Sequence, residues 1–418
     1  MTVSRARRAG WGGFVLLGLF VLARCAGSGP AVPAAPPAGA PEAPRGPAYT
    51  TVFFDAGALR QRDERTGEVT TLLAGARYAG PRVHAPAGDR LAFGYVAGDS
   101  SHLAVLDPAT GAVHTLHTAA RNTVYTAAWS PDGTALAFGF YAPRRTDDGA
   151  EEMGPGGIRI ATGDGPAPFA RAVVRDAGCR AARAVEAWLP GGRLVVRDQR
   201  QWDRRTLYVV SPEDCADQAR IDARKMHAVT FSADGRWMAY LERNLRYNRE
   251  NRAYEPDTTL FVADAYGNDP RRVAGPEARP RRPAWSPRGA QLAYDRLAPD
   301  NPAIRQIYFY EPAEARHTVL SPEALVHEAN LRWSPSATRF VFDRRPDAVT
   351  FQKVVRIFGG YRVVDETTAA GRLATTWGWL DDEHLVLLDD GRVRLVDVNA
   401  ERADTLHAGS QLLHLKAR

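Results

Sequence analysis

The stretch AWSPDGTALAF at residues 128–138 predicts two short strands joined by a tight turn. Pro131 fixes φ at the first corner of that turn, Asp132 bonds to nearby backbone, and Gly133 takes a left-handed conformation without steric cost. Apolar residues flank the turn on both sides. The stretch is therefore typical of a β-hairpin.

This hairpin recurs along the chain. Recognisable copies are anchored at residues 84, 129, 188, 231, 285, 333 and 379, a mean step of about 49 residues, which is close to the length of a four-stranded propeller blade. A second apolar hairpin follows each copy, for example residues 103–107 with 113–116. Each repeat therefore supplies four strands, A to D, which make up one blade.

The two ends of the repeat region match each other. Residues 51–75 align without a gap to residues 385–409, with nine of 25 positions identical. The chain thus begins with strands B, C and D of a blade, and the apolar residues 411–415 can supply the missing strand A. We expect an all-β fold: a β-propeller of four-stranded antiparallel blades, closed by a C-terminal strand that joins the N-terminal blade. Eight blades are favoured; seven is the alternative if residues 50–75 only decorate the ring.

The pattern W-S-P-D-G-x-x-L-A-F, followed by a strand such as LYVV (207–210) or IYFY (307–310), resembles the TolB-like β-propeller repeat. That repeat is also found in the propellers of prolyl-oligopeptidase-type enzymes. The resemblance spans roughly residues 50–418 and implies a WD-type propeller. We expect a stand-alone propeller, without the TolB N-terminal domain or a peptidase domain, so the resemblance does not extend to a Tol-system role or to peptidase chemistry.

Residues 1–25 resemble an export signal. A basic segment at residues 5–8 precedes an apolar run at residues 11–23, which has the length of a signal-peptide core and is short for a membrane span. The sequence LARC at residues 22–25 resembles a lipobox, in which Cys25 would be lipidated, although Arg24 departs from that pattern. Plain cleavage near residues 25–27 and an uncleaved anchor are the alternatives.

Residues 26–48 are rich in proline and alanine and predict a disordered, extended tether. The propeller, residues 49–418, would then be exported. It would lie in the periplasm, or face the periplasm or cell surface as a membrane-anchored lipoprotein.

The charge of the chain gives no support for nucleic acid as a partner. The formal net charge is +6, but residues 1–24 contribute four arginines and no acid. The remaining charge of +2 is that of an ordinary folded domain.

The residues that break the repeat are the better candidates for function. Two B–C loops are long, residues 141–157 and 243–255, and in a propeller these loops share a face with the D–A connections. Arginine and tyrosine are favoured at contact surfaces, and arginine binds carboxylate and phosphate in a bidentate manner. The predicted binding residues are Arg246, Tyr247, Arg249, Arg252, Tyr254, Arg279, Arg281 and Arg282. A solvated, arginine-rich loop is the alternative interpretation.

Catalytic and metal-binding patterns are weak. The tryptophans at the repeat position are expected to pack between blades, with His84 as a packing substitute in that column. In the turn context Ser130 and Asp132 are expected to be turn residues. The ten histidines are scattered, without a His-Glu-x-x-His or Cys-x-x-Cys pattern, so we expect no cofactor, no metal and no catalytic residue.

Cys179 and Cys215 remain once Cys25 is set aside, and an oxidising compartment would permit a bridge between them. Cys179 falls in a D–A connection and Cys215 in a C–D turn. These segments should lie on opposite faces, which argues against a disulfide.

We expect a binding or scaffolding module whose partner is an envelope protein or an anionic envelope polymer, held at the membrane by its N-terminal lipid or anchor. The alternative is a propeller enzyme, a polysaccharide lyase or hydrolase, acting at the central channel. Convergent histidines and carboxylates at the channel mouth would favour the enzyme.

Overall fold

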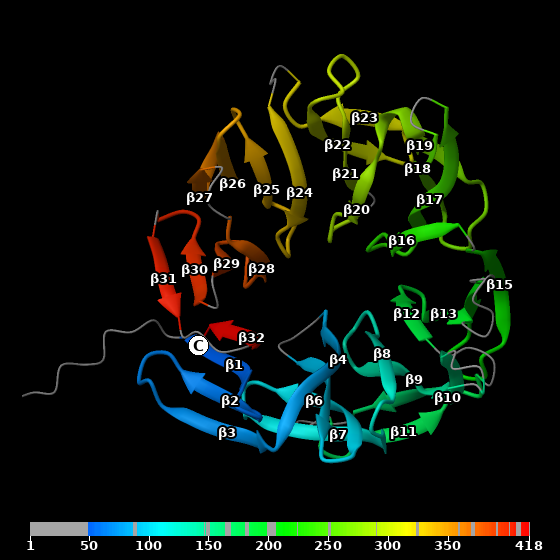
Figure 1. Ribbon diagram of the computed structural model, residues 1–418. Helices are drawn as coiled ribbons and strands as arrows, with labels where there is room; N and C mark the ends of the chain where they lie inside the picture. Colours follow the sequence, from blue (N-terminus) through cyan, green and yellow to red (C-terminus); the bar gives the residue numbers. More distant parts are fainter. Residues whose placement is uncertain are drawn as a thin grey trace, which may run out of the picture. The chain divides into compact units, whose positions relative to one another are not determined.

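Eight antiparallel sheets of four strands each stand around a ring in the described part of the chain (Figure 1). This computed structural model describes residues 49–86, 90–145, 147, 151–163, 169–179, 184–198, 206–223, 225–249, 252–289, 291–322, 326–357, 360–368, 373–389, 392–400, 402–406 and 411–417. They all belong to one compact unit, residues 44–418. The predicted leader, Cys25 and the tether lie outside the described residues.

We number the sheets as blades 1 to 8, with strand A innermost and strand D outermost. Blade 1 is β32 (Gln411–Ala417), β1 (Tyr49–Asp55), β2 (Ala58–Asp63) and β3 (Val69–Ala74). Blade 2 is β4 (Ala76–His84), β5 (Leu91–Ala97), β6 (Ser100–Asp107) and β7 (Ala112–Ala120). Blade 3 is β8 (Val124–Trp129), β9 (Ala135–Arg145), β10 (Glu151–Thr162) and β11 (Val173–Asp176). Blade 4 is β12 (Ala184–Leu189), β13 (Arg193–Asp198), β14 (Thr206–Val210) and β15 (Asp217–Asp222).

The second half of the ring repeats this order. Blade 5 is β16 (Met226–Phe231), β17 (Trp237–Asn248), β18 (Ala253–Asp264) and β19 (Arg271–Ala274). Blade 6 is β20 (Arg281–Trp285), β21 (Leu292–Leu297), β22 (Arg305–Glu311) and β23 (Arg316–Val319), preceded by the short 3-10 helix η1 (Pro276–Ala278). Blade 7 is β24 (His327–Trp333), β25 (Phe340–Arg345), β26 (Thr350–Ile357) and β27 (Gly360–Thr368). Blade 8 is β28 (Thr375–Trp379), β29 (His384–Asp389), β30 (Arg392–Asp397) and β31 (Arg402–Leu406). Among the described residues, no helix is long and apolar enough to cross a membrane.

The ring closes through the shared blade that the matching ends predicted. Strand β32 pairs antiparallel with β1, with Leu415 opposite Thr51 and His414 opposite Val52. Blade 1 therefore takes its A strand from the C-terminus and its other strands from the N-terminus. The prediction of eight blades is confirmed, and the seven-blade alternative is not what the chain forms.

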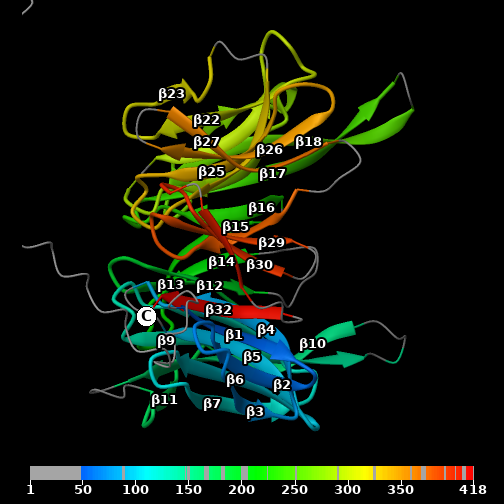
Figure 2. The same ribbon diagram turned by 90° about the vertical axis from the view of Figure 1, so that its left-hand side faces the viewer.

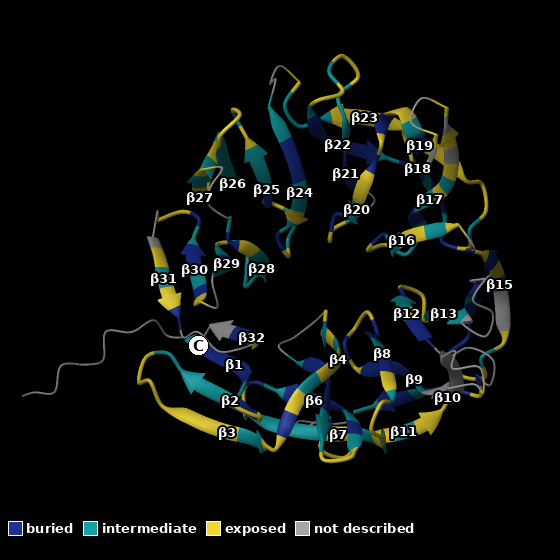
Figure 3. Ribbon diagram, in the orientation of Figure 1, coloured by how far each residue is buried: buried dark blue, intermediate teal, exposed yellow. Residues whose placement is uncertain are grey.

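The core lies between the blades rather than at one centre. The middle strands are buried and the outermost strands are exposed (Figure 3), as in β5, where five of seven residues are buried, and β23, where three of four are exposed. Ile158 and Ile160 of blade 3 pack in one apolar cluster with Val185 and Leu194 of blade 4. Each small core is shared by two neighbours, so the length of the chain needs no single large core.

Tryptophan side chains at the ends of A strands join neighbouring blades. The indole Nε1 of Trp129 donates a hydrogen bond of 2.8 Å to the backbone carbonyl of Val83 in blade 2. Trp285, Trp333 and Trp379 make the same bond to the A strand of the preceding blade, at 3.2, 3.2 and 3.3 Å. The prediction that these tryptophans pack between blades is confirmed for these four.

The C–D turn of a blade lies against the outermost strand of the blade before it. Arg271 of β19 donates to the carbonyl of Pro312 in the turn of blade 6, and Arg362 of β27 donates to that of Val398 in blade 8. The outer rim of the propeller is thus held by contacts between successive blades as well as by the inner tryptophans.

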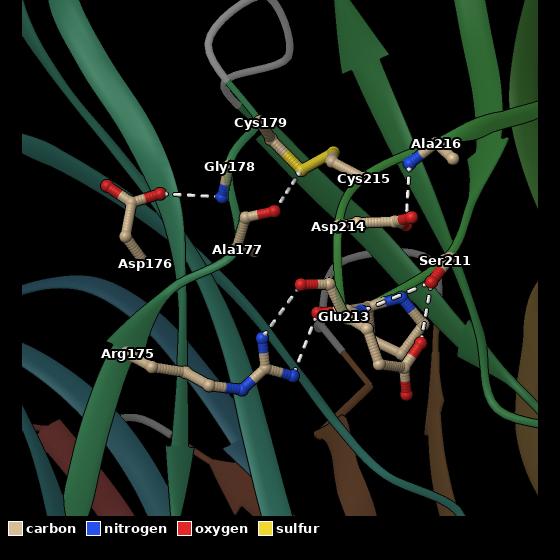
Figure 4. The surroundings of a disulfide bond; sticks show 11 residues. Arg175, Asp176, Ala177, Gly178, Cys179, Ser211, Glu213, Asp214, Cys215 and Ala216 are labelled. Carbon is tan, nitrogen blue, oxygen red and sulfur yellow. Dashed lines mark hydrogen bonds between the residues drawn. A yellow bond between two sulfur atoms is a disulfide. The ribbon is translucent and has the colours of Figure 1, made fainter.

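Cys179 and Cys215 form a disulfide at one of these outer joints, between blades 3 and 4 (Figure 4). Their Cα atoms are 5.2 Å apart, within the usual range for a disulfide. Arg175 of β11 donates beside them to the carbonyls of Pro212 and Glu213, at 2.9 and 3.3 Å. The expectation that the cysteines lie on opposite faces was wrong. Strand β11 has only four residues, and the C–D turn of blade 4 lies against the end of this short strand.

The two segments predicted as long B–C loops are instead β-hairpin arms. Strands β9 and β10 stay paired out to Arg145 and Glu151, and strands β17 and β18 out to Asn248 and Ala253. Figure 2 shows both arms projecting from the same face of the ring. The two B–C connections therefore lie on one face, as expected, but they are extended strands rather than loops.

Candidate functional site

The eight predicted binding residues divide between two places. Tyr247 and Tyr254 are cross-strand partners on the β17–β18 arm, with ring centroids 5.2 Å apart. Arg249 and Arg252 are exposed at its tip, and the backbone of Arg246 belongs to β17, while the Arg246 side chain lies outside the described residues. The remaining three lie where the chain passes from blade 5 into blade 6: Arg279, Arg281 and Arg282.

The connection from blade 5 to blade 6 is held through its backbone. After η1, Arg279 takes a left-handed conformation with φ 43°. Its carbonyl oxygen accepts a hydrogen bond of 2.8 Å from Nη1 of Arg305 at the start of β22. The backbone of Arg279 therefore has a structural role, while its side chain and that of Arg281 are exposed.

Behind this connection, Arg305 and Asp295 form a buried ion pair. Their N···O distance is 2.8 Å, and the side chains are 7% and 3% exposed. Asp295 also accepts the backbone N–H of Asn330 from blade 7. Burial raises the pKa of Asp295 and lowers the pKa of Arg305, and the attraction between the two charges opposes both shifts. The pair connects three strands of two blades.

Asn330 joins blade 6 to blade 7 through its side chain as well. It occupies a bulge in β24 with φ 65°, a conformation in which asparagine is enriched. Its side-chain oxygen accepts a hydrogen bond from Arg282, and its amide nitrogen donates to Asp343 at 2.6 Å. Lys353 binds the other carboxylate oxygen of Asp343 at 2.5 Å.

Arg282 itself stands at a bulge, in β20, with φ 52°. Bulges redirect side chains and are frequent beside binding sites. The bulges in two successive A strands bring Arg282 and Asn330 together at the wall of the central channel.

A cavity of about 660 Å³ opens beside this network, against the inner strands of blades 6, 7 and 8. Trp285, Trp333 and Trp379 line it with aromatic surface, and Arg282 and Arg332 line it with positive charge. Its lining residues include no histidine, aspartate or glutamate. This lining suits a ligand that carries an anionic group on an apolar or planar body. Arginine can bind the anionic group with two parallel hydrogen bonds, and the indoles can pack against the body.

A second cavity of about 490 Å³ lies against the inner strands of blades 3, 4 and 5. Aromatic and proline side chains dominate it, among them Trp129, Trp188 and Phe231. Its one carboxylate, Glu186, forms an ion pair with Arg197. This cavity lacks the paired cations of the first.

Residues that resemble parts of catalytic motifs have structural partners. Ser130 donates to Asp132 at 2.6 Å and accepts the backbone N–H of Ala135 at 2.9 Å. The hydrogen bonds from Ser130 and Thr134 lower the pKa of Asp132. Both are turn residues of the hairpin, as predicted.

His84 occupies the tryptophan column of blade 2, as predicted. Its ring lies edge-on to Trp377, with centroids 5.9 Å apart, and 5.4 Å from the ring of His414. No group of three or more potential metal-ligating residues is found within the described residues.

Sequence reasoning missed five residues of the network: Asp295, Arg305, Asn330, Asp343 and Lys353. A signal for the two aspartates was present, because LAYD and FVFD place a carboxylate at the fourth position of strand B, where blades 2 and 3 have glycine. An acid at a position that is otherwise apolar or small indicates a buried polar partner. The bulge at Asn330 has no comparable signature.

Comparisons with known proteins concern the fold of the chain and identify no function. No family model matches the chain, and no curated protein matches it. A structure of Porphyromonas gingivalis dipeptidyl peptidase 4 is similar at 14% identity and a TM-score of 0.50, covering 81% of this chain and 53% of that one. The chain thus spans about half the length of that protein.

Two further solved structures are similar to this chain. The β-propeller domain of the Trilobed protease from Pyrococcus furiosus is 11% identical with a TM-score of 0.47, covering 81% of this chain and 95% of that one. TolB from Acinetobacter baumannii is 12% identical with a TM-score of 0.40, covering 88% and 82%. At these identities the likeness concerns the fold alone, and the chain has a β-propeller fold.

Proposed function

We propose that the protein is a binding module that holds an anionic partner at the channel wall of blades 6 to 8. The observation that carries this proposal is the 660 Å³ cavity, in which Arg282 and Arg332 face a lining without any carboxylate. Two arginines beside indole rings, in a lining that contains no carboxylate, favour an anion with an apolar body.

Each part of the cavity has a role in this proposal. Arg282 is oriented by its bond to Asn330, and Asn330 is fixed in turn by Asp343 and Lys353. A side chain oriented in advance loses less conformational entropy on binding, so the network favours affinity. The indoles of Trp285, Trp333 and Trp379 are held by their own structural bonds and form a rigid wall.

The predicted leader and tether complete the proposal. An exported propeller on an N-terminal lipid or signal anchor would present this channel to envelope proteins or to anionic envelope polymers. Catalysis is supported less well, because the lining of the two channel cavities supplies one carboxylate, Glu186, and no histidine.

The test uses two anionic probes, a hexaglutamate peptide and an oligogalacturonate, titrated against the purified chain by calorimetry. Arg282→Ala and Arg332→Ala should each weaken binding by about 1.5–3 kcal/mol, roughly ten- to a hundredfold in Kd. Arg272→Ala is the matched control, because Arg272 is an exposed arginine on the outermost strand of blade 5.

Equal Kd values for all three variants would remove the channel wall from consideration. Cleavage of the oligogalacturonate, followed by the ultraviolet absorbance of an unsaturated uronate, would instead support a lyase.

A further inference from the structure

The β17–β18 arm is a two-stranded ribbon that leaves the ring. Pairing of β17 with β16 stops at Glu242, and pairing of β18 with β19 stops at Leu260. Beyond Glu242, six cross-strand pairs run out to Asn248 opposite Ala253, a length of about 20 Å at the usual rise of a strand. Figure 2 shows this arm projecting from one face of the ring. Its tip therefore reaches a flat surface in front of that face before the blades do.

One side of the arm is apolar and exposed. Side chains alternate along a strand, so Leu245 and Tyr247 share a side of β17, and Tyr254 stands opposite Tyr247 on β18. These three side chains are 67%, 49% and 69% exposed, and the two tyrosine ring centroids lie 5.2 Å apart. Clustered exposed apolar side chains mark interaction sites. A surface that covers this side of the arm removes apolar area from water.

Positive charge flanks the apolar side at both ends of the arm. Arg243 lies at the base, Arg249 and Arg252 lie at the tip, and all three are exposed. Residues 243–255 contain four arginines and two glutamates, so the net charge of the arm is +2. Arginine binds phosphate with two parallel hydrogen bonds. The arm therefore offers an anionic surface both positive charge and apolar area.

This combination fits an anionic membrane better than a folded partner protein. Tyrosine is enriched where the apolar core of a bilayer meets its headgroups, and arginine extends its charged end toward the headgroups. Each basic residue near an anionic leaflet strengthens binding by about fivefold. A narrow ribbon offers little of the roughly 800 Å² that a stable protein interface buries on each partner, whereas a bilayer can enclose its tip.

We propose that the side of the β17–β18 arm formed by Leu245, Tyr247 and Tyr254 docks on an anionic lipid bilayer. The apolar side chains enter the boundary between headgroups and acyl chains, and the arginines at the tip bind lipid phosphates. The β9–β10 arm projects from the same face, but residues 141–157 carry two arginines against four acids. An anionic surface therefore selects the β17–β18 arm. This proposal does not depend on a ligand in the channel.

The test is hydrogen–deuterium exchange of the full-length chain without vesicles, with neutral phosphatidylcholine vesicles, and with vesicles that also contain phosphatidylglycerol. Exchange is read peptide by peptide, so contact of the predicted leader with the vesicles does not affect the reading for the arm. We expect slower exchange of residues 243–255 on the anionic vesicles alone, with no change in residues 141–157.

Substitutions on the arm separate charge from apolar area. Arg249→Glu/Arg252→Glu should lower the ratio of docked to free arms by about twentyfold or more, and Leu245→Ser should lower it by about tenfold. Arg220→Glu/Arg272→Glu is the matched control for charge and should leave the ratio unchanged, because both arginines are exposed on outermost strands, those of blades 4 and 5. Circular dichroism confirms that each variant is folded.

Equal protection on neutral and anionic vesicles would overturn the proposal, as would protection that survives in Arg249→Glu/Arg252→Glu. An arm that exchanges equally fast with and without anionic vesicles would overturn it too. Protection by soluble glycerol phosphate at the same phosphate concentration would assign the arginines to a free anion in place of a membrane, and would overturn the docking of the arm on lipid.

Discussion

The β17–β18 arm, residues 243–255, is called the basic arm here because it carries four arginines. The basic arm and the channel wall of blades 6 to 8 both use arginine and aromatic residues, but for different purposes. On the arm, Tyr247 and Tyr254 touch each other across a ribbon of two strands and remain largely exposed. At the channel wall, Arg282 bonds to Asn330, which contacts the buried Asp295 of blade 6 and the partly exposed Asp343 of blade 7. Sequence reasoning placed both in a single patch. The difference between the two regions shows that the role of an arginine depends on the residues that hold its side chain in place.

We therefore expect the channel wall to be sensitive to substitution and the arm to tolerate it. Removing a buried charge leaves its partner unpaired in a poorly solvated place, whereas an exposed side chain exchanges one set of water contacts for another. The following substitutions test this contrast, beginning with the largest effect.

Replacing Asp295 should have the largest effect. Asp295→Ala leaves Arg305 buried without its carboxylate and should lower the free energy of unfolding by about 3–5 kcal/mol. Urea denaturation followed by circular dichroism measures the loss. Asp300→Ala, an exposed acid in the B–C loop of the same blade, should change it by less than about 0.5 kcal/mol. Similar losses in the two variants would show that the pair does not stabilise the wall.

Replacing Asn330 should have the second largest effect on the free energy of unfolding. Asn330→Ala removes the bonds to Arg282 and Asp343 and should cost about 1.5–3 kcal/mol, as expected for hydrogen bonds to charged groups. Asn330→Gly loses the same bonds, but glycine adopts φ 65° without strain. The glycine variant therefore measures the contribution of the side-chain bonds to stability apart from that of the backbone conformation. Full stability of the glycine variant would mean that the side-chain bonds contribute nothing.

The pH dependence of the wall follows from His327. Burial lowers its pKa, and the positive charges of Arg305, Arg345 and Arg281 lower it further. The unfolded chain, with an ordinary histidine pKa near about 6.5, then binds the proton more tightly than the folded chain. Stability contributed by neutral His327 is present above that pH and is lost as the pH falls below it.

Thermal melts at pH 7.5 and 5.5 check this effect. The original chain should lose more stability on acidification than His327→Gln, which cannot titrate there. Equal losses would show that His327 is not under the influence of these arginines. The basic arm contains no histidine between residues 243 and 255, so its behaviour should not change over this range.

The smallest effect on stability is expected on the arm. Tyr247→Thr breaks one exposed cross-strand aromatic pair, whose contribution is about 0.2–1 kcal/mol. Global unfolding in urea should hardly change, because the pair supports only a ribbon outside the ring. A loss above about 2 kcal/mol would place the arm in the core of the fold and end the contrast.

The architecture could be predicted because its signals are local and repeated. The turn at Ser130 to Gly133 recurs with each blade, and the gapless match of residues 51–75 to 385–409 identified the shared blade. These features depend on turn chemistry and alternation, which act between close neighbours in the chain.

The site was predicted only in part, because it depends on contacts between blades. Arg282 was named, but its partner Asn330 is 48 residues away and owes its position to a bulge. The sequence argued against the disulfide because nothing in it shows that the C–D turn of a blade packs against the preceding blade. The arms were taken for loops because their polar residues conceal the strand pairing seen from Arg243 to Asn248.

Hydrogen–deuterium exchange with and without the hexaglutamate peptide tests the central claim most directly. The account predicts slower exchange in the peptide segments of β20 and β24, around Arg282 and Asn330, with no change in the basic arm. Protection confined to residues 243–255, or protection nowhere in the ring, would contradict it.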